Sequence, residues 1–381
     1  MKFLLLTALL AVLQQYAKAG LLPIREHVDI VWTWSSGTWT CNAVTGSASH
    51  IPSTVFMSMT DKPYVNGSPS TSGSRFTQPA SSSFNFTGAA TGAPLWIAVQ
   101  GTPGTGEAWP GFDNKQSAGT FGSYIPSDTR VSQTTAREYI RVSLAGYTPP
   151  PGVSSQFSMW TTSGSVPKVW MSTFDSSVVN DYYYTVGSHT HMNWGFTAPG
   201  IHKVRLTASA FLGPGATNPT GSSAVHEFVF AIGEFAKWQA ENFSAAALED
   251  PAITGPSADP DGDDSNNLIE YAFGTDPLKG GVAGLPDGLG LPGLSITTEG
   301  GVFYQTLVYP RRRAVAEVSP VIYQPLFAPS PSGPWSAAGV TELVSNFTGD
   351  QAALNAVWEK VTARKPLGGG SHGFARVAVS R

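Results

Sequence analysis

Cysteine and charge are the two things that this sequence has least of. Its 381 residues include one cysteine, Cys41, and only 13% Asp, Glu, Lys and Arg, about half the usual share of charged residues. A single cysteine excludes intramolecular disulfides, so the fold must be held by packing or by metal ions. We interpret Cys41 as a small buried hydrophobe rather than a reactive thiol.

Long apolar runs are also scarce. One run, from Phe3 to Leu13, follows Lys2 and precedes Ala17-Lys18-Ala19, a pattern typical of a secretory signal with a small-x-small cleavage site. A membrane anchor is the alternative, but the run is too short to span a bilayer. We therefore predict a signal peptide over residues 1–19 and an extracellular or cell-surface location. No second run of spanning length follows, and the final residues show neither a hydrophobic anchor nor a sorting motif, so we expect no transmembrane segment after cleavage.

The charge balance excludes a general attraction to polyanions. Removal of Lys2 and Lys18 with the signal takes the formal net charge from −4 to −6. We therefore expect no binding to nucleic acid or to anionic lipid through overall charge.

Glycine, proline and aromatic residues are plentiful, and short strand-like runs lie between them. The chain has 41 Gly, 29 Pro and 11% aromatics, a mixture that suits a turn-rich β protein better than a disordered one. Runs such as Val28–Trp32 and Ile140–Leu144 recur up to Ile232. We predict a mainly β fold, with a large β-sandwich or jelly-roll-like domain over residues 20–232.

The pattern changes after residue 232. Apolar positions from Phe235 to Leu248 favour a short amphipathic helix that is broken near Asn242. This helix and an acidic loop form a predicted connector over residues 233–280. Runs such as Val302–Tyr309 and Phe374–Val379 then predict a small C-terminal β domain over residues 281–381, with one helical ambiguity at Ala352–Lys360.

Two histidine-bearing runs suggest a metal site in the first domain. Residues on alternate positions of a strand share a face, so His189 and His191 lie on one face, together with Asn193 if the strand continues. His27 and Asp29 repeat the same spacing. Three imidazoles and one carboxylate suit zinc or manganese. The alternative is that the histidines pair with backbone or carboxylate oxygens in an aromatic β core.

The acidic loop has the spacing of a twelve-residue calcium loop. Carboxylates recur at positions one, three and five, a side-chain oxygen is at nine, and a glutamate is at twelve. The predicted ligands are Asp259, Asp261, Asp263, the backbone carbonyl of Ser265, Asn267 and Glu270. The turn glycine expected at position six is Asp264, which must adopt a positive φ. The alternative is a solvated acidic turn without an ion.

Two segments resemble known families. The acidic loop resembles the dockerin and thrombospondin type 3 style of calcium loop. Residues 235–381, with Asp259-Pro-Asp-Gly-Asp and Asn267-Leu-Ile-Glu-Tyr-Ala-Phe-Gly-Thr-Asp, resemble a tail module that is common in large exported proteins of verrucomicrobial and planctomycete bacteria. Residues 21–232, with Glu26-His-Val-Asp-Ile30 and Ser188 to Gly200, resemble the choice-of-anchor M domain, recognised in surface-anchored proteins of actinobacteria. The resemblance implies a bacterial surface or secreted protein rather than a particular reaction.

Three hypotheses about function follow. The first is a non-catalytic exported protein that binds an unidentified cell-envelope or extracellular ligand, with calcium ordering the connector. The second is an extracellular metallohydrolase that acts on a polymer through His27, Asp29, His189, His191 and a metal-activated water. The third is a structural envelope component in which the histidines only pack. The run Gly101-Thr-Pro-Gly-Thr-Gly106 lacks the lysine and the strand-to-helix context of a phosphate loop.

Overall fold

The computed structural model describes residues 20–66, 68, 72–164, 166–280, 289–313, 320–367 and 373–381. The predicted signal peptide and part of the segment after residue 280 lie outside the described residues. The chain divides into two compact units, which meet in the sequence between Glu249 and Asp250. The predicted connector, residues 233–280, is divided between them.

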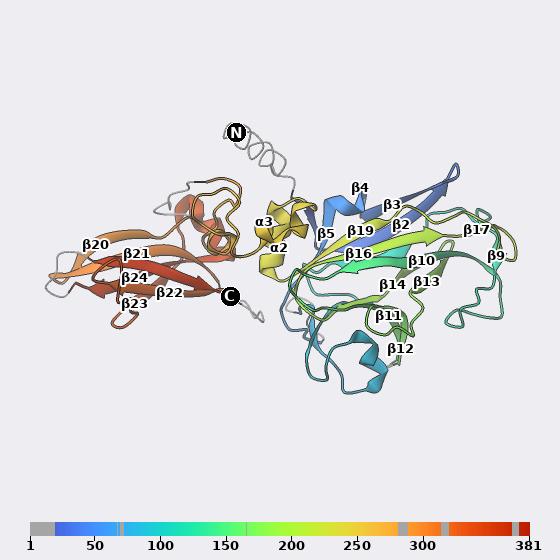
Figure 1. Cartoon of the computed structure of the whole chain (residues 1–381), viewed down its shortest axis with the longest axis horizontal. Helices are drawn as coiled ribbons and strands as arrows, with labels where there is room; N and C mark the ends of the chain where they lie inside the picture. Colours follow the sequence, from blue (N-terminus) through green and yellow to red (C-terminus); the bar gives the residue numbers. More distant parts are fainter. Residues whose placement is uncertain are drawn as a thin grey trace, which may run out of the picture. The chain divides into compact units, whose positions relative to one another are not determined.

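The first unit contains one seven-stranded sheet that mixes parallel and antiparallel pairs. Its order is β1-β5-β19-β16-β10-β13, with β9 beside β10 (Figure 1). The strands are β1 (Leu22–Ile24), β5 (Val55–Met59), β9 (Ser123–Tyr124), β10 (Arg137–Thr148), β13 (Asp181–Thr185), β16 (Gly200–Ser209) and β19 (His226–Ile232).

Two five-stranded sheets complete the layers of this unit. The first has the order β12-β11-β15-β7-β6, and the second has the order β14-β8-β2-β3-β4. Their strands are β6 (Arg75–Thr77), β7 (Pro94–Ala98), β11 (Phe157–Ser163), β12 (Val166–Ser172) and β15 (Asn193–Phe196) in the first, and β2 (His27–Ser35), β3 (Thr38–Thr45), β4 (Ala48–His50), β8 (Trp109–Asp113) and β14 (His189–His191) in the second. A small hairpin, β17 (Phe211–Gly213) with β18 (Thr217–Pro219), stands apart from these sheets.

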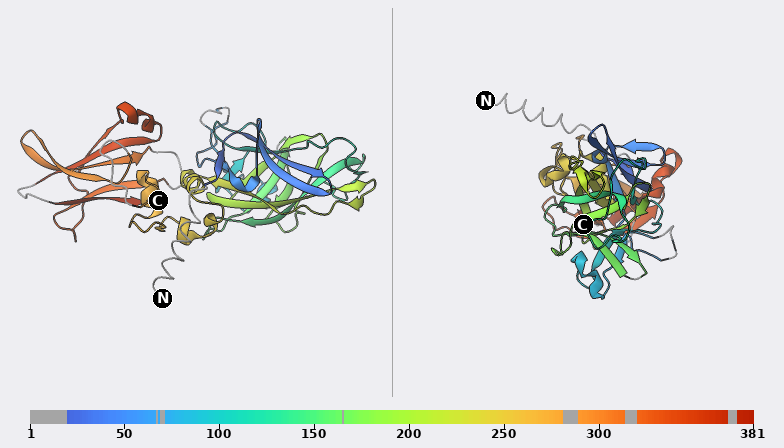
Figure 2. Two further views of the ribbon diagram at one scale, coloured as in Figure 1. Left: turned by 90° about the horizontal axis from the view of Figure 1, so that it is seen from above. Right: turned by 90° about the vertical axis from the view of Figure 1, so that its right-hand side faces the viewer.

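One apolar core joins the three sheets. Trp32 of β2, Trp194 of β15 and Phe230 of β19 are all buried in the same cluster. In the left-hand view of Figure 2 the long strands of this unit run nearly in one direction, as expected when sheets stack face to face. The prediction of a mainly β, sandwich-like fold is confirmed.

Short helices follow the last strand of the sandwich. α2 (Glu234–Asn242) ends where the sequence predicts a break, and a 3₁₀ turn, η3 (Ala247–Glu249), follows. Phe235 and Trp238 of α2 are buried and stack at 5.5 Å. Two more 3₁₀ turns, η1 (Pro52–Thr54) and η2 (Ser82–Thr87), lie in loops.

The second unit is a small β structure with its own core. A four-stranded sheet has the order β20-β21-β24-β23, and β22 pairs with β25. Its elements are α3 (Pro251–Thr254), α4 (Asn267–Phe273), β20 (Gly293–Glu299), β21 (Val302–Arg312), β22 (Ile322–Ala328), β23 (Thr341–Ser345), η4 (Gly349–Ala356), β24 (Trp358–Pro366) and β25 (Phe374–Ser380). The ambiguous segment from Ala352 to Lys360 is a 3₁₀ turn up to Ala356 and a strand from Trp358. Phe273 of α4 packs in one core with Leu307 and Val361.

Candidate metal centre

The histidine cluster is built on neighbouring strands of one sheet. β8 lies between β2 and β14, and Gly111 of β8 is in register with Asp29 on one side and with His191 on the other. Directly paired residues point to the same face of a sheet. Their neighbours Ile30 and Phe112 are buried in the core on the opposite face. The cluster therefore lies on the outer face of the sandwich.

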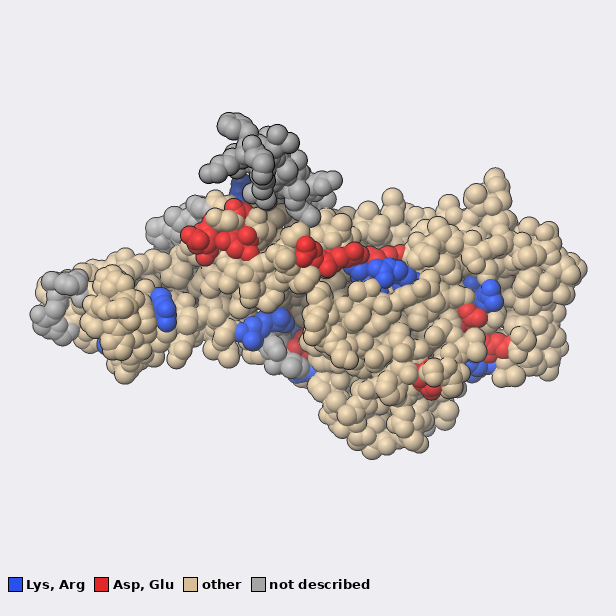
Figure 3. Space-filling view, in the orientation of Figure 1, with Lys and Arg blue, Asp and Glu red and all other residues tan. Residues whose placement is uncertain are grey.

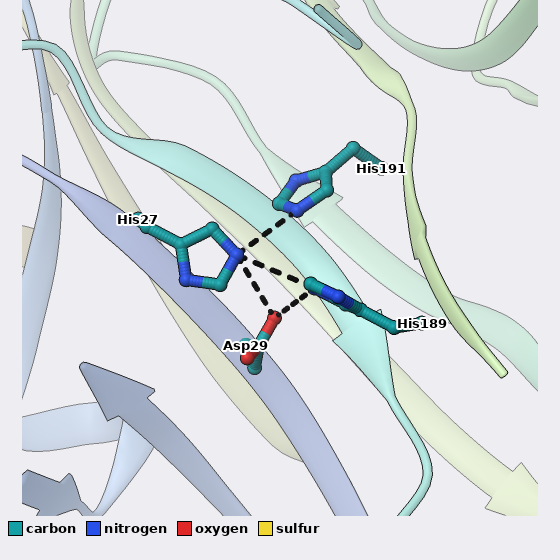
Figure 4. Close-up of side chains that lie close together, drawn as sticks. All are labelled: His27, Asp29, His189 and His191. Carbon is teal, nitrogen blue, oxygen red and sulfur yellow. Dashed lines mark hydrogen bonds and ion pairs between the residues drawn. The ribbon is translucent and has the colours of Figure 1, made fainter. Parts of the chain in front are cut away.

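The four side chains converge on one point (Figure 4). The Nε2 atom of His27 lies 3.3 Å from Nε2 of His189 and 3.1 Å from Nε2 of His191. An Oδ1 oxygen of Asp29 lies 2.8 Å from Nε2 of His189 and 3.5 Å from Nε2 of His27. A tetrahedron with metal–nitrogen bonds of about 2.0–2.1 Å has edges of roughly 3.3 Å. The spacing of the four atoms is close to that of a tetrahedral site.

Hydrogen bonding alone accounts poorly for this arrangement. A neutral imidazole has one N–H and one lone pair, and a carboxylate only accepts. Three Nε2 atoms that face each other cannot all donate and accept at once. A cation at their centre would satisfy all the lone pairs together.

Burial differs among the side chains of the cluster. The side chain of Asp29 is 13% exposed, whereas those of His27 and His189 are 37% and 47% exposed. Burial, together with the nearby His27 and His189, lowers the pKa of His191 to about 4. The neutral imidazole, which is the form that binds a metal, is thus the stable form of His191 at neutral pH.

Two residues that the sequence reasoning missed support the cluster. The ring of Trp109 stacks on His191 at 4.2 Å and meets His27 edge-on at 5.3 Å. Gly111 leaves room for the imidazole, because a Cβ there would lie 2.7 Å from Cε1 of His191. A glycine inside a strand often marks a place where another group packs closely against the backbone. Gly111 within the strand-like run Trp109 to Asp113 could therefore have indicated from the sequence that a side chain packs there.

Asn193 does not join the cluster, so its predicted place on the face of His189 and His191 is wrong. Met192, which is buried, separates β14 from β15, and these strands belong to different sheets. The Oδ1 atom of Asn193 accepts from the backbone N–H of Gln100 at 2.9 Å. This hydrogen bond ties β15 to the segment that follows β7.

The acidic loop before α4 forms a second cluster of oxygen atoms. Asp259, Asp261 and Asp263 each offer an oxygen, and these oxygens lie within 4.8 Å of one another. Acidic side chains gather on the surface in this part of the second unit (Figure 3). Asp264 has a φ of 71°, as the missing turn glycine requires. The backbone N–H of Asp264 donates to Oδ2 of Asp259 at 2.9 Å, which closes the turn.

The remaining predicted calcium ligands have different environments. Glu270 is buried, its Oε2 atom has no hydrogen-bond partner, and burial raises its pKa to about 8, with Asp261 and Asp263 adding to the shift. Ser265 is buried within the loop, and its backbone N–H donates to Oδ1 of Asp263 at 2.8 Å. The side-chain amide of Asn267 donates to the carbonyls of Ile253 and Gly255, so its nitrogen holds the loop while its Oδ1 atom stays unpaired.

The sequence matches no protein-family model, and no curated protein is significantly similar to it. Among the described residues, no helix has the length and apolar character to cross a membrane.

Proposed function

We propose that this protein is an exported, metal-binding protein of the bacterial cell surface whose work is binding rather than catalysis. The observation that carries the proposal is the convergence of three imidazole nitrogens and one carboxylate oxygen on one point of the outer sheet face. Four protein ligands would fill a tetrahedral shell, and a filled shell is typical of a structural site.

Zinc is the ion that this ligand set fits best. Nitrogen-rich, tetrahedral spacing favours zinc, whereas manganese prefers more oxygen ligands and a higher coordination number. Manganese remains the second candidate at the same site. The proposal also includes export of the protein and a first unit similar to the choice-of-anchor M domain. Export is inferred from the signal-like pattern of residues 1–19, and the similarity from the motifs of residues 21–232.

Calcium in the acidic loop is the second part of the proposal. The three clustered aspartates and the buried, unpaired Oε2 atom of Glu270 support it. Without a cation the loop holds several like charges together, and these charges add to the effect of burial, which raises the pKa of Glu270. A calcium ion would remove the repulsion and order the start of the second unit.

The metal-stripped full chain tests the first part. We expect zinc to bind with one-to-one stoichiometry in isothermal titration calorimetry, and His191→Ala to lose the heat of binding. His50→Ala is the matched control, because His50 lies on β4, outside the cluster. Unchanged zinc binding in His191→Ala would contradict the proposal.

A metallohydrolase remains the alternative, and one observation favours it. The side chains of His27 and His189 are more than a third exposed, so a water molecule has room to reach an ion there and become a nucleophile. Hydrolysis of polysaccharide or ester substrates by the zinc-loaded chain, lost in His189→Ala, would establish this function. Zinc retention without turnover supports binding.

A further inference from the structure

A groove on the first unit lies apart from both metal clusters. It encloses about 380 Å³ and is lined by the end of β9, the loop after it, β10, β13, the end of β16 and the β17–β18 hairpin. None of its lining residues belongs to the histidine cluster. Its size is at the lower end of the range for small-molecule sites.

Aromatic rings form one wall of the groove. The ring of Tyr124 contacts Phe211 edge-on, with a centroid distance of 4.9 Å. The ring of Tyr139 contacts Tyr124 and Tyr183 edge-on, at centroid distances of 5.8 and 6.3 Å. These edge contacts fix the rings before any ligand arrives. A rigid aromatic wall can pack against the C–H face of a sugar ring at a low cost in entropy.

One guanidinium supplies the charge. The Nε atom of Arg141 donates to Oγ of Ser209 at 3.2 Å, which orients the side chain, and the side chain is 44% exposed. Asp181 is its nearest carboxylate, at 3.9 Å, and that carboxylate already accepts a hydrogen bond from Ser143. Arg141 is therefore only loosely neutralised and can bind a ligand carboxylate through two N–H groups.

Hydroxyl groups complete the lining. Ser127, Ser209 and Ser222 lie around the groove, beside the phenols of Tyr124 and Tyr183. A carboxylate without hydroxyls of its own would form no hydrogen bonds with these groups and would bind less tightly. A polyhydroxylated ligand would satisfy them.

We propose that this groove binds an acidic saccharide, that is, a sugar whose carboxylate pairs with Arg141 and whose ring packs on the aromatic wall. Ser209 then has two roles, because it orients the guanidinium and faces the ligand. This site goes beyond the proposed metal binding and does not depend on it.

Titration of the full chain with the disaccharides of galacturonate and of glucuronate tests the proposal. We expect saturable binding of at least one by calorimetry or saturation-transfer NMR, and at least tenfold weaker binding of the neutral galactose disaccharide. Benzoate, an aromatic carboxylate without hydroxyls, should bind no better than the neutral sugar.

Variants separate the recognition from the fold. Arg141→Met should weaken binding of the acidic sugar at least tenfold, and Arg141→Lys should restore part of it. Arg25→Met is the matched control, because Arg25 forms an exposed pair with Glu241 outside the groove. Circular dichroism melts check that each variant is folded. Absence of binding to both acidic sugars, equal binding of the neutral one, or full affinity in folded Arg141→Met would each overturn the proposal.

Discussion

At the scale of single residues, the geometry of the histidine cluster depends on a residue outside it, Gly111. Gly111 lies between Asp29 and His191 in the register of the sheet. A Cβ at this position would come within 2.8 Å of Nδ1 of His191 and 2.7 Å of the carbonyl oxygen of Thr190. The backbone oxygen cannot move without breaking the pairing of β14 with β8, so the imidazole must be displaced.

We therefore expect Gly111→Ala to lower zinc affinity by about 10- to 100-fold, the range found when supporting residues of a metal site are changed. Calorimetry on the metal-stripped chain measures this loss. Gly101→Ala is the control, because a Cβ at Gly101 meets open space and its φ is not positive. Equal zinc affinity in the two variants would contradict the role of Gly111.

A second residue-scale prediction concerns the dependence of stability on pH. His202 is fully buried, and burial lowers its pKa to about 3. Its Nε2 atom donates to the carbonyl of Ala198 at 2.9 Å, so Nδ1 is the acceptor that faces the hydroxyl of Tyr147 at 2.8 Å. Neutral His202 fits this site, and a protonated imidazole does not.

Above pH 6.5 His202 is neutral in both the folded and the unfolded states. Below pH 6.5 the unfolded state binds a proton that the folded state does not, so the free energy of unfolding should fall as the pH drops from 6.5 toward 3, by at most about 1.4 kcal/mol per pH unit. Thermal melts between pH 7 and pH 4 measure this slope. His202→Gln should flatten the slope, and His50→Gln should retain it. A slope that is unchanged in His202→Gln would show that other groups cause it.

At the scale of elements, β14 is the part of the first unit that a metal would change most. It is three residues long, it lies at the edge of its sheet, and it leads through Met192 into β15 of another sheet. Short edge strands open easily. A metal bound by His189 and His191 on β14 and by His27 and Asp29 on β2 would link β14 to β2 across the strand between them, β8.

Zinc should therefore slow amide exchange at residues 189–191 in hydrogen–deuterium exchange, by tenfold or more at saturation. The strands of the seven-stranded sheet serve as the internal reference, since they contribute no ligands to the cluster. His191→Ala should show no zinc-dependent slowing. Equal slowing of β14 and the reference strands would point to a global effect instead.

In the second unit, Arg312 of β21 connects α4 to the four-stranded sheet. The guanidinium of Arg312 lies over the rings of Tyr271 and Trp358, at 3.8 and 4.4 Å, and its Nε atom donates to the carbonyl of Tyr271 at 2.8 Å. A planar guanidinium can stack on both rings and donate in its own plane, and an ammonium cannot.

Arg312→Lys should destabilise the second unit by about 1–2 kcal/mol, because stacking and the in-plane hydrogen bond are both lost. Urea unfolding followed by tryptophan fluorescence measures the change. Lys365→Ala, on the same β24 that carries Trp358, is the control and should change stability by less than about 0.5 kcal/mol. A loss of similar size in both variants would argue against a special role for Arg312.

At the scale of the whole molecule, each unit has a separate apolar core and a separate candidate cation site. Ligands stabilise the unit that binds them, by about 2.7 kcal/mol at a concentration of one hundred times Kd. The two cations should therefore act on different parts of the chain.

Differential scanning calorimetry of the full chain should show zinc raising one transition and calcium raising the other, each by several degrees. His191→Ala should abolish the zinc effect alone, and Glu270→Gln should weaken the calcium effect alone. A single transition that both ions raise equally would contradict the independence of the two units.

Strand periodicity and composition were enough to predict the mainly β fold, the break near Asn242 and the positive φ of Asp264, because these follow from local preferences of the chain. The spacing of His27 with Asp29 and of His189 with His191 also predicted which side chains share a face. Only the tertiary structure placed β8 between those two strands, so it alone showed the roles of Gly111 and Trp109. It also separated Asn193 from the cluster and formed the groove around Arg141. These features depend on which strands become neighbours, and strands far apart in the sequence are brought together by burial of one shared core rather than by any local pattern.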